Sequence, residues 1–305
     1  PFIDRKIYVE TRDILRKKYF FRRMALRLKL FFHKYDVLFY PVYSRNKFGD
    51  MIARWVRADE KVAFDGDSAN DPDNERASRD KYFTRIIRSE SRLLKEIDRN
   101  AEFINHLGGH LRTEDLRTRV WFKDSDQEES NRILDKKGLR DGNYICVFPG
   151  AGFPNKHWGT DNWVEFLEKF FSMWSSTKIV LLGGPADAEV NSAILTRLRS
   201  REHIVDLSDS LNLRVLAKVI ERSKLLVSMD TAAIHIAAAV GTSNICIIGG
   251  WNFGRFYPYG DPAKNRIVYK RMDCYGCNWQ CRYPYTKCIL DIKSGDVLKE
   301  VQKIL

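Results

Sequence analysis

Short apolar runs alternate with helical patterns along the second half of the chain. Each run has the length of a strand, and the segment after it carries apolar residues every three or four positions, which is typical of βαβ units on a parallel sheet. The predicted strands span residues 144–148, 178–182, 204–207, 225–229 and 244–248. The predicted helices span residues 161–175, 187–200, 213–223 and 231–240. The pattern therefore predicts a Rossmann-like domain.

The first of these helices shows the pattern most clearly. Its large apolar residues fall at spacings of three and four: Trp163, Phe166, Leu167, Phe170, Phe171 and Trp174. Because residues at these spacings share one face of a helix, we expect this face to pack on the sheet.

The first 125 residues are less regular. They predict strands over 6–9, 36–42 and 61–64, a basic helix before the second strand, a helix near 48–57 and a long helical region near 85–107. Residues 65–74 are rich in turn formers and predict a loop. These elements fit the second half of another α/β domain. We therefore predict an incomplete amino-terminal domain, residues 1–125, and a carboxyl-terminal domain, residues 126–305, with a linker near 124–130.

The composition is that of a packed globular protein. Hydrophobic residues make up 44% of the chain and charged residues 30%, so disorder is not expected to dominate. Apolar runs such as 179–182 and 245–248 are far shorter than the ~20 residues that span a bilayer. The chain starts with neither an initiator methionine nor a signal-peptide pattern, and we expect it to be a piece of a longer protein.

The formal net charge of +12 indicates which kinds of ligand the protein attracts. It creates a positive field that attracts phosphate groups, whether in nucleic acid, in anionic lipid or in a nucleotide-linked substrate. Much of the excess lies early, where phenylalanine, methionine and leucine are interleaved with Arg16-Lys17-Lys18, Arg22-Arg23, Arg27 and Lys29. This mixture predicts a basic amphipathic helix. It is either a surface helix whose basic side chains cover apolar neighbours or a helix that contacts a membrane surface.

Glycines and polar residues follow three of the predicted strands. In a doubly wound sheet, ligands bind beyond the carboxyl ends of the strands, where helix N-termini present free N–H groups. After the first strand, Gly150 allows close backbone approach and Lys156 supplies a mobile positive charge. After the second strand come Gly183 and Gly184, with Glu189 one helical turn further on. An ordinary turn would contain the same glycines.

The third strand end carries the richest chemistry. Asp230 is placed to cap the helix that follows, and Thr231 and His235, four residues apart, share one face of that helix. The structural alternatives are a plain helix cap for Asp230 and a buried, hydrogen-bonded histidine for His235.

Taken together, the three loops resemble glycosyltransferase family 9, the lipopolysaccharide heptosyltransferases, in order and in sequence. The matching segments are Pro149-Gly150-Ala151, Asn155-Lys156-His157-Trp158, Leu182-Gly183-Gly184-Pro185, Asp230-Thr231-Ala232-Ala233-Ile234-His235 and Ala237-Ala238-Ala239-Val240-Gly241-Thr242. The combination is specific, unlike any of its parts, and the resemblance covers most of the chain. It implies an α/β fold of the GT-B type, with two Rossmann-like domains facing a cleft and the donor, usually ADP-heptose, held mainly by the second.

The resemblance also implies roles for individual residues. By position, Gly150, Ala151 and Lys156 would hold the diphosphate, Glu189 would reach the ribose and Leu211 would lie near the adenine. The remaining donor-binding residues implied by the family are Asp230, Thr231, Ala232 and His235 on the phosphate and sugar side, together with Gly183 and Gly184.

Two positions depart from the family pattern. Members commonly carry a hydroxyl residue where this chain has Ala151, and a glycine where it has Ala232. The second change adds a Cβ at the closest backbone approach to the donor.

The catalytic base of the family is an aspartate in a Gly-Asp pair after the first strand of the whole protein. The similar pair here is Gly49-Asp50, after the strand predicted at 36–42. The segments before this pair resemble parts of the family that follow the first βαβ unit, so we expect the catalytic loop to lie upstream. Asp50 is then a surface or capping residue, and the base is unassigned.

Four cysteines lie close together near the end of the chain: Cys274, Cys277, Cys281 and Cys288. Four thiols in so short a segment are a candidate tetrahedral zinc or iron site, although their spacing is not that of two separate Cys-x2-Cys pairs. Free thiols are the alternative in a reducing cytoplasm. The other two cysteines, Cys146 and Cys246, fall in predicted strands and are expected in the core.

The leading hypothesis is a bacterial glycosyltransferase that moves a sugar, with inversion, from a nucleotide diphosphate sugar to a hydroxyl of a glycolipid or glycan. An aspartate base would deprotonate the acceptor. Lys156, His235 and helix N-termini would stabilise the departing diphosphate in place of a metal ion, so that transfer needs no cofactor. We expect a cytoplasmic protein, peripheral at the inner membrane if the basic helix contacts lipid.

Two alternatives stay open. One is a pseudoenzyme that binds the donor and transfers nothing. The other is a basic nucleic-acid-binding protein with a cysteine metal module, as the charge and the cysteines would allow. It leaves the strand-end motifs unexplained, and the basic residues lie far from the cysteines, so no nucleic-acid partner is expected.

Overall fold

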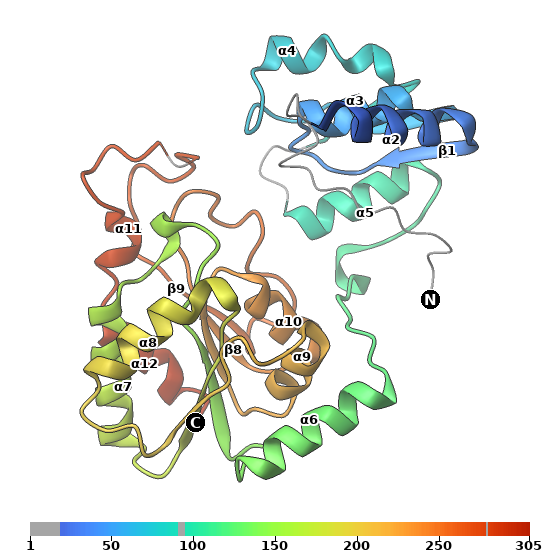
Figure 1. Ribbon diagram of the computed structural model, residues 1–305. Helices are drawn as coiled ribbons and strands as arrows, with labels where there is room; N and C mark the ends of the chain where they lie inside the picture. Colours follow the sequence, from blue (N-terminus) through green and yellow to red (C-terminus); the bar gives the residue numbers. More distant parts are fainter. Residues whose placement is uncertain (1–18, 91–94, 279) are drawn as a thin grey trace. The chain divides into compact units, whose positions relative to one another are not determined.

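The computed structural model describes residues 19–90, 95–278 and 280–305. The chain divides into two compact units, Pro1–Glu114 and Asp115–Leu305 (Figure 1). The predicted strand at residues 6–9 lies outside the described residues. No helix among the described residues is both long and apolar enough to cross a membrane.

The amino-terminal unit is built on a three-stranded parallel sheet. Its strands, in sheet order, are β1 (Lys34–Tyr40), β2 (Arg57–Phe64) and β3 (Arg85–Ile87). Its helices are α2 (Phe20–Phe32), α3 (Lys47–Trp55), α4 (Asp73–Ala77) and α5 (Glu96–His106), with the 3-10 turn η2 (Asp80–Tyr82). The 3-10 turn η3 (Thr113–Asp115) spans the boundary between the units.

Side chains alternate across this sheet, as the pleat of a strand requires. Phe64 of β2 packs with Phe103 of α5, whereas its neighbour Ala63 packs with Ala53 of α3 and with Phe83. Helices α5 and α3 therefore lie against opposite faces of β2.

The predicted long helix near 85–107 is wrong. Arg85–Ile87 pair with β2 and bury Ile87 beside Val62, and α5 begins only at Glu96. The loop predicted at 65–74 is confirmed up to Pro72, and its last two residues begin α4. The basic helix is confirmed as α2.

The carboxyl-terminal unit holds a six-stranded, fully parallel sheet in the order β6-β5-β4-β7-β8-β9. Its strands are β4 (Tyr144–Phe148), β5 (Lys178–Leu181), β6 (Ile204–Asp206), β7 (Leu226–Met229), β8 (Asn244–Ile247) and β9 (Asn265–Val268). Its helices are α6 (Asp124–Lys136), α7 (Thr160–Met173), α8 (Ala188–Arg197), α9 (Leu213–Glu221), α10 (Ala232–Val240), α11 (Lys287–Leu290) and α12 (Ser294–Gln302), with 3-10 turns η4 (Pro154–Lys156) and η5 (Pro185–Asp187). The five predicted strands and four predicted helices are confirmed, with ends shifted by a few residues, whereas β9, α6, α11 and α12 were not predicted.

Helices cover both faces of this sheet. One core cluster joins the sheet to Phe166 of α7, Ile194 of α8 and Val301 of α12. The other joins it to Leu134 of α6 and to helices α9 and α10. The two layers leave the carboxyl ends of the strands to the loops, which is where the functional residues gather.

The predicted linker at 124–130 is wrong, because these residues begin α6. The Lys123 N–H donates to the Asp126 carboxylate at 2.8 Å and so caps the helix. Its buried positions are Asp126, Ser130 and Leu134. Two of the three are polar, so the sequence lacks the apolar periodicity that normally predicts a helix. The predicted domain boundary after residue 125 falls inside the first turn of α6.

Candidate functional site

The order of the strands brings three of the loops that carry polar residues to one point of the sheet. Strand β4 lies between β5, which follows it in sequence, and β7, which comes three strands later. Such a reversal of strand order opens a crevice at the carboxyl ends, and it is where doubly wound sheets bind ligands. The loops after β4, β7 and β8 leave neighbouring strands at this edge.

Lys156 and Asp230 meet at this point. The Lys156 Nζ lies 3.0 Å from the Asp230 Oδ2 and 3.2 Å from the Asp230 carbonyl oxygen. Both side chains are largely buried, with 12% and 10% exposed. The loop after β4 and the end of β7 thus place an ammonium group beside the start of α10, the arrangement that suits a phosphate.

Asp230 does not cap α10, which corrects the sequence prediction. Helix α10 begins at Ala232, and its N-cap is Thr231, whose hydroxyl accepts from the Ala233 N–H at 3.4 Å. The physical reason is that the Asp230 carboxylate turns to Lys156 instead. Ala232 is exposed at the first position of the helix.

His235 lies one turn further along α10, among aromatic rings. Its Nδ1 lies 3.1 Å from the Tyr259 hydroxyl, and the two rings stack at 5.7 Å. The Tyr257 ring meets it edge-on at 6.0 Å. The structure therefore supplies the hydrogen bond expected of a buried histidine.

Burial lowers the pKa of His235 below its ordinary value of 6.5, and Asp230 raises this pKa while Lys156 lowers it further. In the window between the folded-state pKa and 6.5, the unfolded chain therefore binds more protons than the folded chain. The free energy of unfolding then falls as the pH drops through this window.

We expect His235→Gln to remove this part of the pH dependence, because glutamine does not titrate. Urea denaturation at several values between about pH 5 and pH 7 measures it for both proteins. Equal slopes for the two proteins would mean that His235 is not held neutral.

The glycines after β4 and β5 make room for a residue that the sequence prediction missed. A Cβ on Gly150 would lie 2.0 Å from the Asp187 Oδ1, and one on Gly183 would lie 2.9 Å from the Asp187 Cβ. The Asp187 Oδ2 accepts from the Gly184 N–H at 2.9 Å. Asp187 thus ties the loops after β4 and β5 together. An aspartate just before a helix, after Gly-Gly-Pro, was the available signal.

Three further predicted residues lie at the same edge without a defined polar role. Ala151 packs against the core, Glu189 is exposed in the first turn of α8, and Leu211 is half-buried before α9. Their contacts with the diphosphate, the ribose and the adenine stay predictions.

Trp251 also belongs to this edge, and the sequence prediction missed it. It follows β8, and the Lys156 Nζ lies 4.4 Å from the centroid of its ring. The signal was the same as for the other loops, because Gly249-Gly250 follow an apolar strand that neighbours β7 in the sheet.

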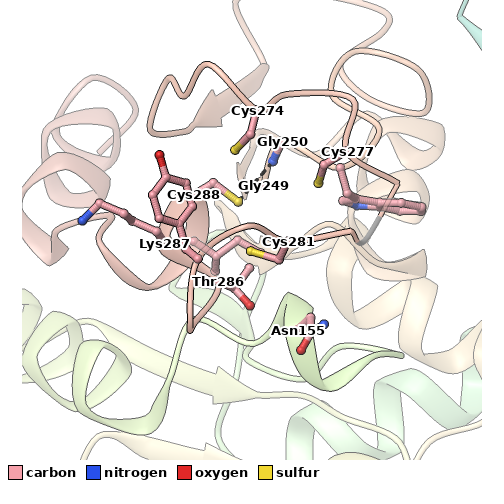
Figure 2. A pocket seen from close by; sticks show the side chains of 12 residues that line it. Asn155, Gly249, Gly250, Cys274, Cys277, Cys281, Thr286, Lys287 and Cys288 are labelled. Atoms are coloured by element: carbon pink, nitrogen blue, oxygen red, sulfur yellow. Dashed lines mark hydrogen bonds between the residues drawn. The ribbon is translucent and has the colours of Figure 1, made fainter.

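The four clustered cysteines line one pocket, together with Asn155, Gly249, Gly250 and Trp251 (Figure 2). All four are free thiols. Burial raises the pKa of Cys288, and the three other thiols raise it as well. In the parts of the chain that the structure describes, no three His, Cys, Asp or Glu residues are grouped so that they could hold a metal ion. The predicted structural zinc or iron is therefore not supported.

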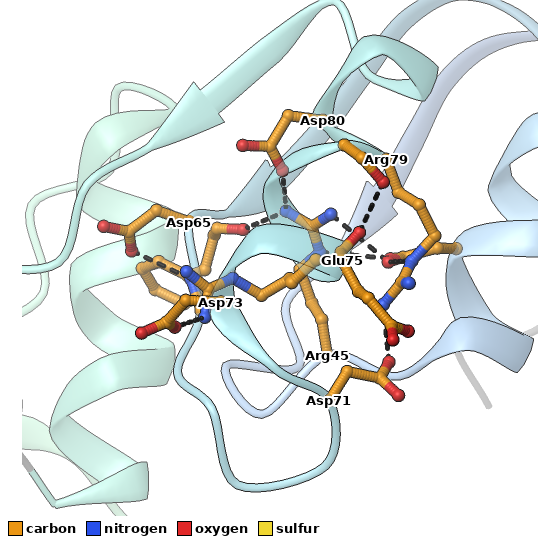
Figure 3. A network of polar contacts seen from close by, with 12 residues as sticks. Arg45, Asp65, Asp71, Asp73, Glu75, Arg79 and Asp80 are labelled. Atoms are coloured by element: carbon orange, nitrogen blue, oxygen red, sulfur yellow. Dashed lines mark hydrogen bonds and ion pairs between the residues drawn. The ribbon is translucent and has the colours of Figure 1, made fainter.

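Asp50 lies in the amino-terminal unit, bonded to two arginines of a network of charges. Figure 3 shows these two, Arg45 and Arg79, among their acidic neighbours. Arg45 donates to its carboxylate from Nε at 3.0 Å, and Arg79 donates from Nε at 2.8 Å. Arg45 and Asp50 are fully buried, and Asn46 caps α3, so the predicted surface or capping role of Asp50 is wrong. The neighbouring Gly49 also has a packing role, because a Cβ there would lie 2.0 Å from the Tyr40 hydroxyl. Packing explains Gly49 and the pairing of charges explains Asp50, so neither residue requires a role in binding the sugar acceptor.

Comparison with known proteins identifies relatives among sugar transferases. Residues 51–283 match the family model described as "Glycosyltransferase family 9 (heptosyltransferase)". A lipooligosaccharide heptosyltransferase 2 of Campylobacter jejuni is 23% identical over 194 residues, or 62% of this chain and 60% of that protein. Lipopolysaccharide heptosyltransferase 1 of Escherichia coli K12 is 25% identical over 163 residues, or 53% of this chain and 44% of that protein. The chain thus spans about 60% or less of the length of these two relatives.

Solved structures agree with the predicted fold. A glycosyl transferase family 9 protein from Veillonella parvula matches with a TM-score of 0.68 and 16% identity, covering 92% of this chain and 76% of that chain. The E. coli heptosyltransferase WaaC with ADP matches with a TM-score of 0.65 and 18% identity, covering 97% and 81%. At such identities the matches bear on the fold alone, and they confirm the predicted α/β fold of the GT-B type.

Proposed function

The chain belongs to glycosyltransferase family 9, and from this premise we propose that it transfers a sugar from a nucleotide diphosphate sugar such as ADP-heptose. The acceptor is a lipopolysaccharide or another glycan, and the anomeric centre is inverted. The observation that carries the proposal is the meeting of Lys156 and Asp230 beside the start of α10, at the reversal of strand order.

The donor site that we propose lies wholly in the carboxyl-terminal unit. Lys156 and the first N–H groups of α10 take the diphosphate, because both present positive charge to it. Asp230 and His235 face the phosphate and sugar, and Glu189 and Leu211 take the ribose and adenine. The remaining contacts come from the loops around the site: Gly150, Ala151, Gly183, Gly184, Thr231 and Ala232.

The chemistry follows from the charge of the leaving group. When the sugar departs, negative charge develops on the diphosphate, and a fixed ammonium group and helix N–H groups stabilise it without reorganisation. We therefore propose that transfer requires no metal ion. We assign no residue of this chain as the base that takes the proton of the acceptor hydroxyl. The candidate carboxylate, that of Asp50, already accepts hydrogen bonds from Arg45 and Arg79.

We also propose that the protein acts in the cytoplasm, at the surface of the inner membrane. A nucleotide-sugar donor places the reaction in the cytoplasm, and a glycolipid acceptor places it at the inner membrane. Helix α2 supports a peripheral contact there, because it exposes Phe21 and Phe32 beside basic residues.

The test is a transfer assay with ADP-heptose and a lipid A–type acceptor. We expect this chain to bind ADP-heptose and ADP in calorimetry and, because none of its residues is assigned as the base, to release no ADP by itself even with the acceptor. A UDP-sugar serves as the control donor. Release that depends on the acceptor would show that one of these residues, Asp50 first, is the base, whereas no binding of any nucleotide would refute the proposed site.

A further inference from the structure

The Lys156 ammonium has a second kind of neighbour besides carboxylate and carbonyl oxygens. Its Nζ lies 4.4 Å from the centroid of the Trp251 ring, within the range of a cation–π interaction, and tryptophan is the strongest partner for one. An aromatic face attracts a cation without neutralising it, so the ammonium keeps its charge for a ligand.

Contacts of the Trp251 ring and of the preceding backbone both fix the position of Trp251. Its ring stacks with Phe256 at 6.1 Å and 28°. Before it, the Gly250 N–H donates to the Cys288 Sγ at 3.5 Å. A Cβ on Gly250 would lie 2.2 Å from the Tyr275 Cδ1, so this backbone packs directly on the Tyr275 ring.

Tyr275 and Cys288 belong to the cysteine-rich segment, of which the structure describes residues 270–278 and 280–288. Tyr275 is itself fixed, because its hydroxyl donates to the Lys270 carbonyl oxygen at 2.6 Å. The pocket that the four thiols line also includes Trp251. Figure 2 shows Asn155, the residue before Lys156, at the same pocket. The segment therefore adjoins Trp251 and the residue that precedes Lys156.

We propose that Trp251 is a positioning residue for the donor diphosphate, and that the cysteine-rich segment holds Trp251 in place. The inference rests on the proposed donor site and adds a part to it. When the diphosphate arrives, Lys156 exchanges the Asp230 carboxylate for phosphate oxygens, and the indole face keeps the ammonium group at the carboxyl end of β4 during the exchange. The cysteine-rich segment thereby gains a role that requires no metal ion.

The experiment measures the affinity for ADP by calorimetry in Trp251→Leu and Trp251→Phe. Leucine removes the aromatic face and phenylalanine keeps a weaker one. We expect Trp251→Leu to raise the Kd between about 2-fold and 30-fold, the range for exposed to desolvated cation–π pairs, and Trp251→Phe to raise it less. Trp121→Leu, at an exposed tryptophan of the same unit, is the matched control and should leave the Kd unchanged.

The decisive readout is coupling to Lys156. If Trp251 acts through the ammonium group, Trp251→Leu has no further effect on the Kd in a Lys156→Ala background. An equal loss in both backgrounds would overturn the inference, and so would wild-type affinity in Trp251→Leu. Thermal unfolding of each variant shows whether a loss of ADP affinity comes from misfolding. If Trp251→Leu is misfolded, the ADP affinity of Trp251→Phe tests the inference instead. If the wild-type chain itself binds no ADP, the proposed function fails instead.

A third variant tests the support from the cysteine-rich segment. Cys288→Ala removes the sulfur that accepts from Gly250, and we expect it to weaken ADP binding by a part of the Trp251→Leu effect. The loss should vanish when Trp251 is already leucine. Wild-type affinity in Cys288→Ala would overturn the role of this segment.

Discussion

Replacing Asp50 by asparagine is expected to cost about 3–5 kcal/mol of the unfolding free energy of the amino-terminal unit. The carboxylate is fully buried and receives hydrogen bonds from both Arg45 and Arg79. Asparagine keeps the shape but removes the charge, so that, of the carboxylates that the structure describes, only Asp80 still pairs with Arg45 and only Asp71 with Arg79. The loss is greatest for Arg45, which is fully buried. Urea denaturation followed by circular dichroism measures the loss.

The matched control for this substitution is Asp73→Asn. Asp73 also pairs with an arginine, Arg76, at 2.7 Å, but its side chain is 60% exposed. An exposed pair is worth only about 0–1 kcal/mol, so the control should unfold almost as the wild type does. Both variants should keep ADP affinity, because the proposed donor residues lie in the other unit. If Asp50→Asn were fully stable and yet lost sugar transfer with donor affinity intact, Asp50 would be the catalytic base.

Replacing Lys156 by alanine is expected to weaken ADP or ADP-heptose binding by about 1.5–3 kcal/mol, the value of a hydrogen bond to a charged group. This corresponds to roughly a 10-fold to 150-fold higher Kd. The change also leaves the Asp230 carboxylate without the ammonium group 3.0 Å away, and this negative charge then repels the diphosphate. Calorimetry with ADP measures the effect.

Lys299→Ala is the control for the loss of a lysine that pairs with an aspartate. Its Nζ lies 3.1 Å from the Asp296 Oδ1 on α12, and its side chain is 72% exposed. This variant should bind ADP as the wild type does. Unchanged affinity in a folded Lys156→Ala protein would remove Lys156 from the donor site.

Local sequence was sufficient to predict the elements whose formation depends on apolar periodicity alone. The alternation of strand-length apolar runs with amphipathic helices predicted the parallel sheet of the carboxyl-terminal unit, because each element there buries an apolar face. It failed at α6, whose buried face includes Asp126 and Ser130. It also failed at β3, whose three residues form a strand only because β2 lies beside them.

The sequence by itself determined the class of the fold, the family and the residues at three strand ends, because these depend on periodicity and on the order of short motifs. Only the tertiary structure decided which of those residues meet. Strand order brings Lys156 to Asp230 across 74 positions of the chain, adds Trp251 from the next strand end and moves the helix cap to Thr231. It also surrounds Asp50 with two arginines. Contacts of this kind depend on the order in which strands pair, and no local pattern of residues encodes that order.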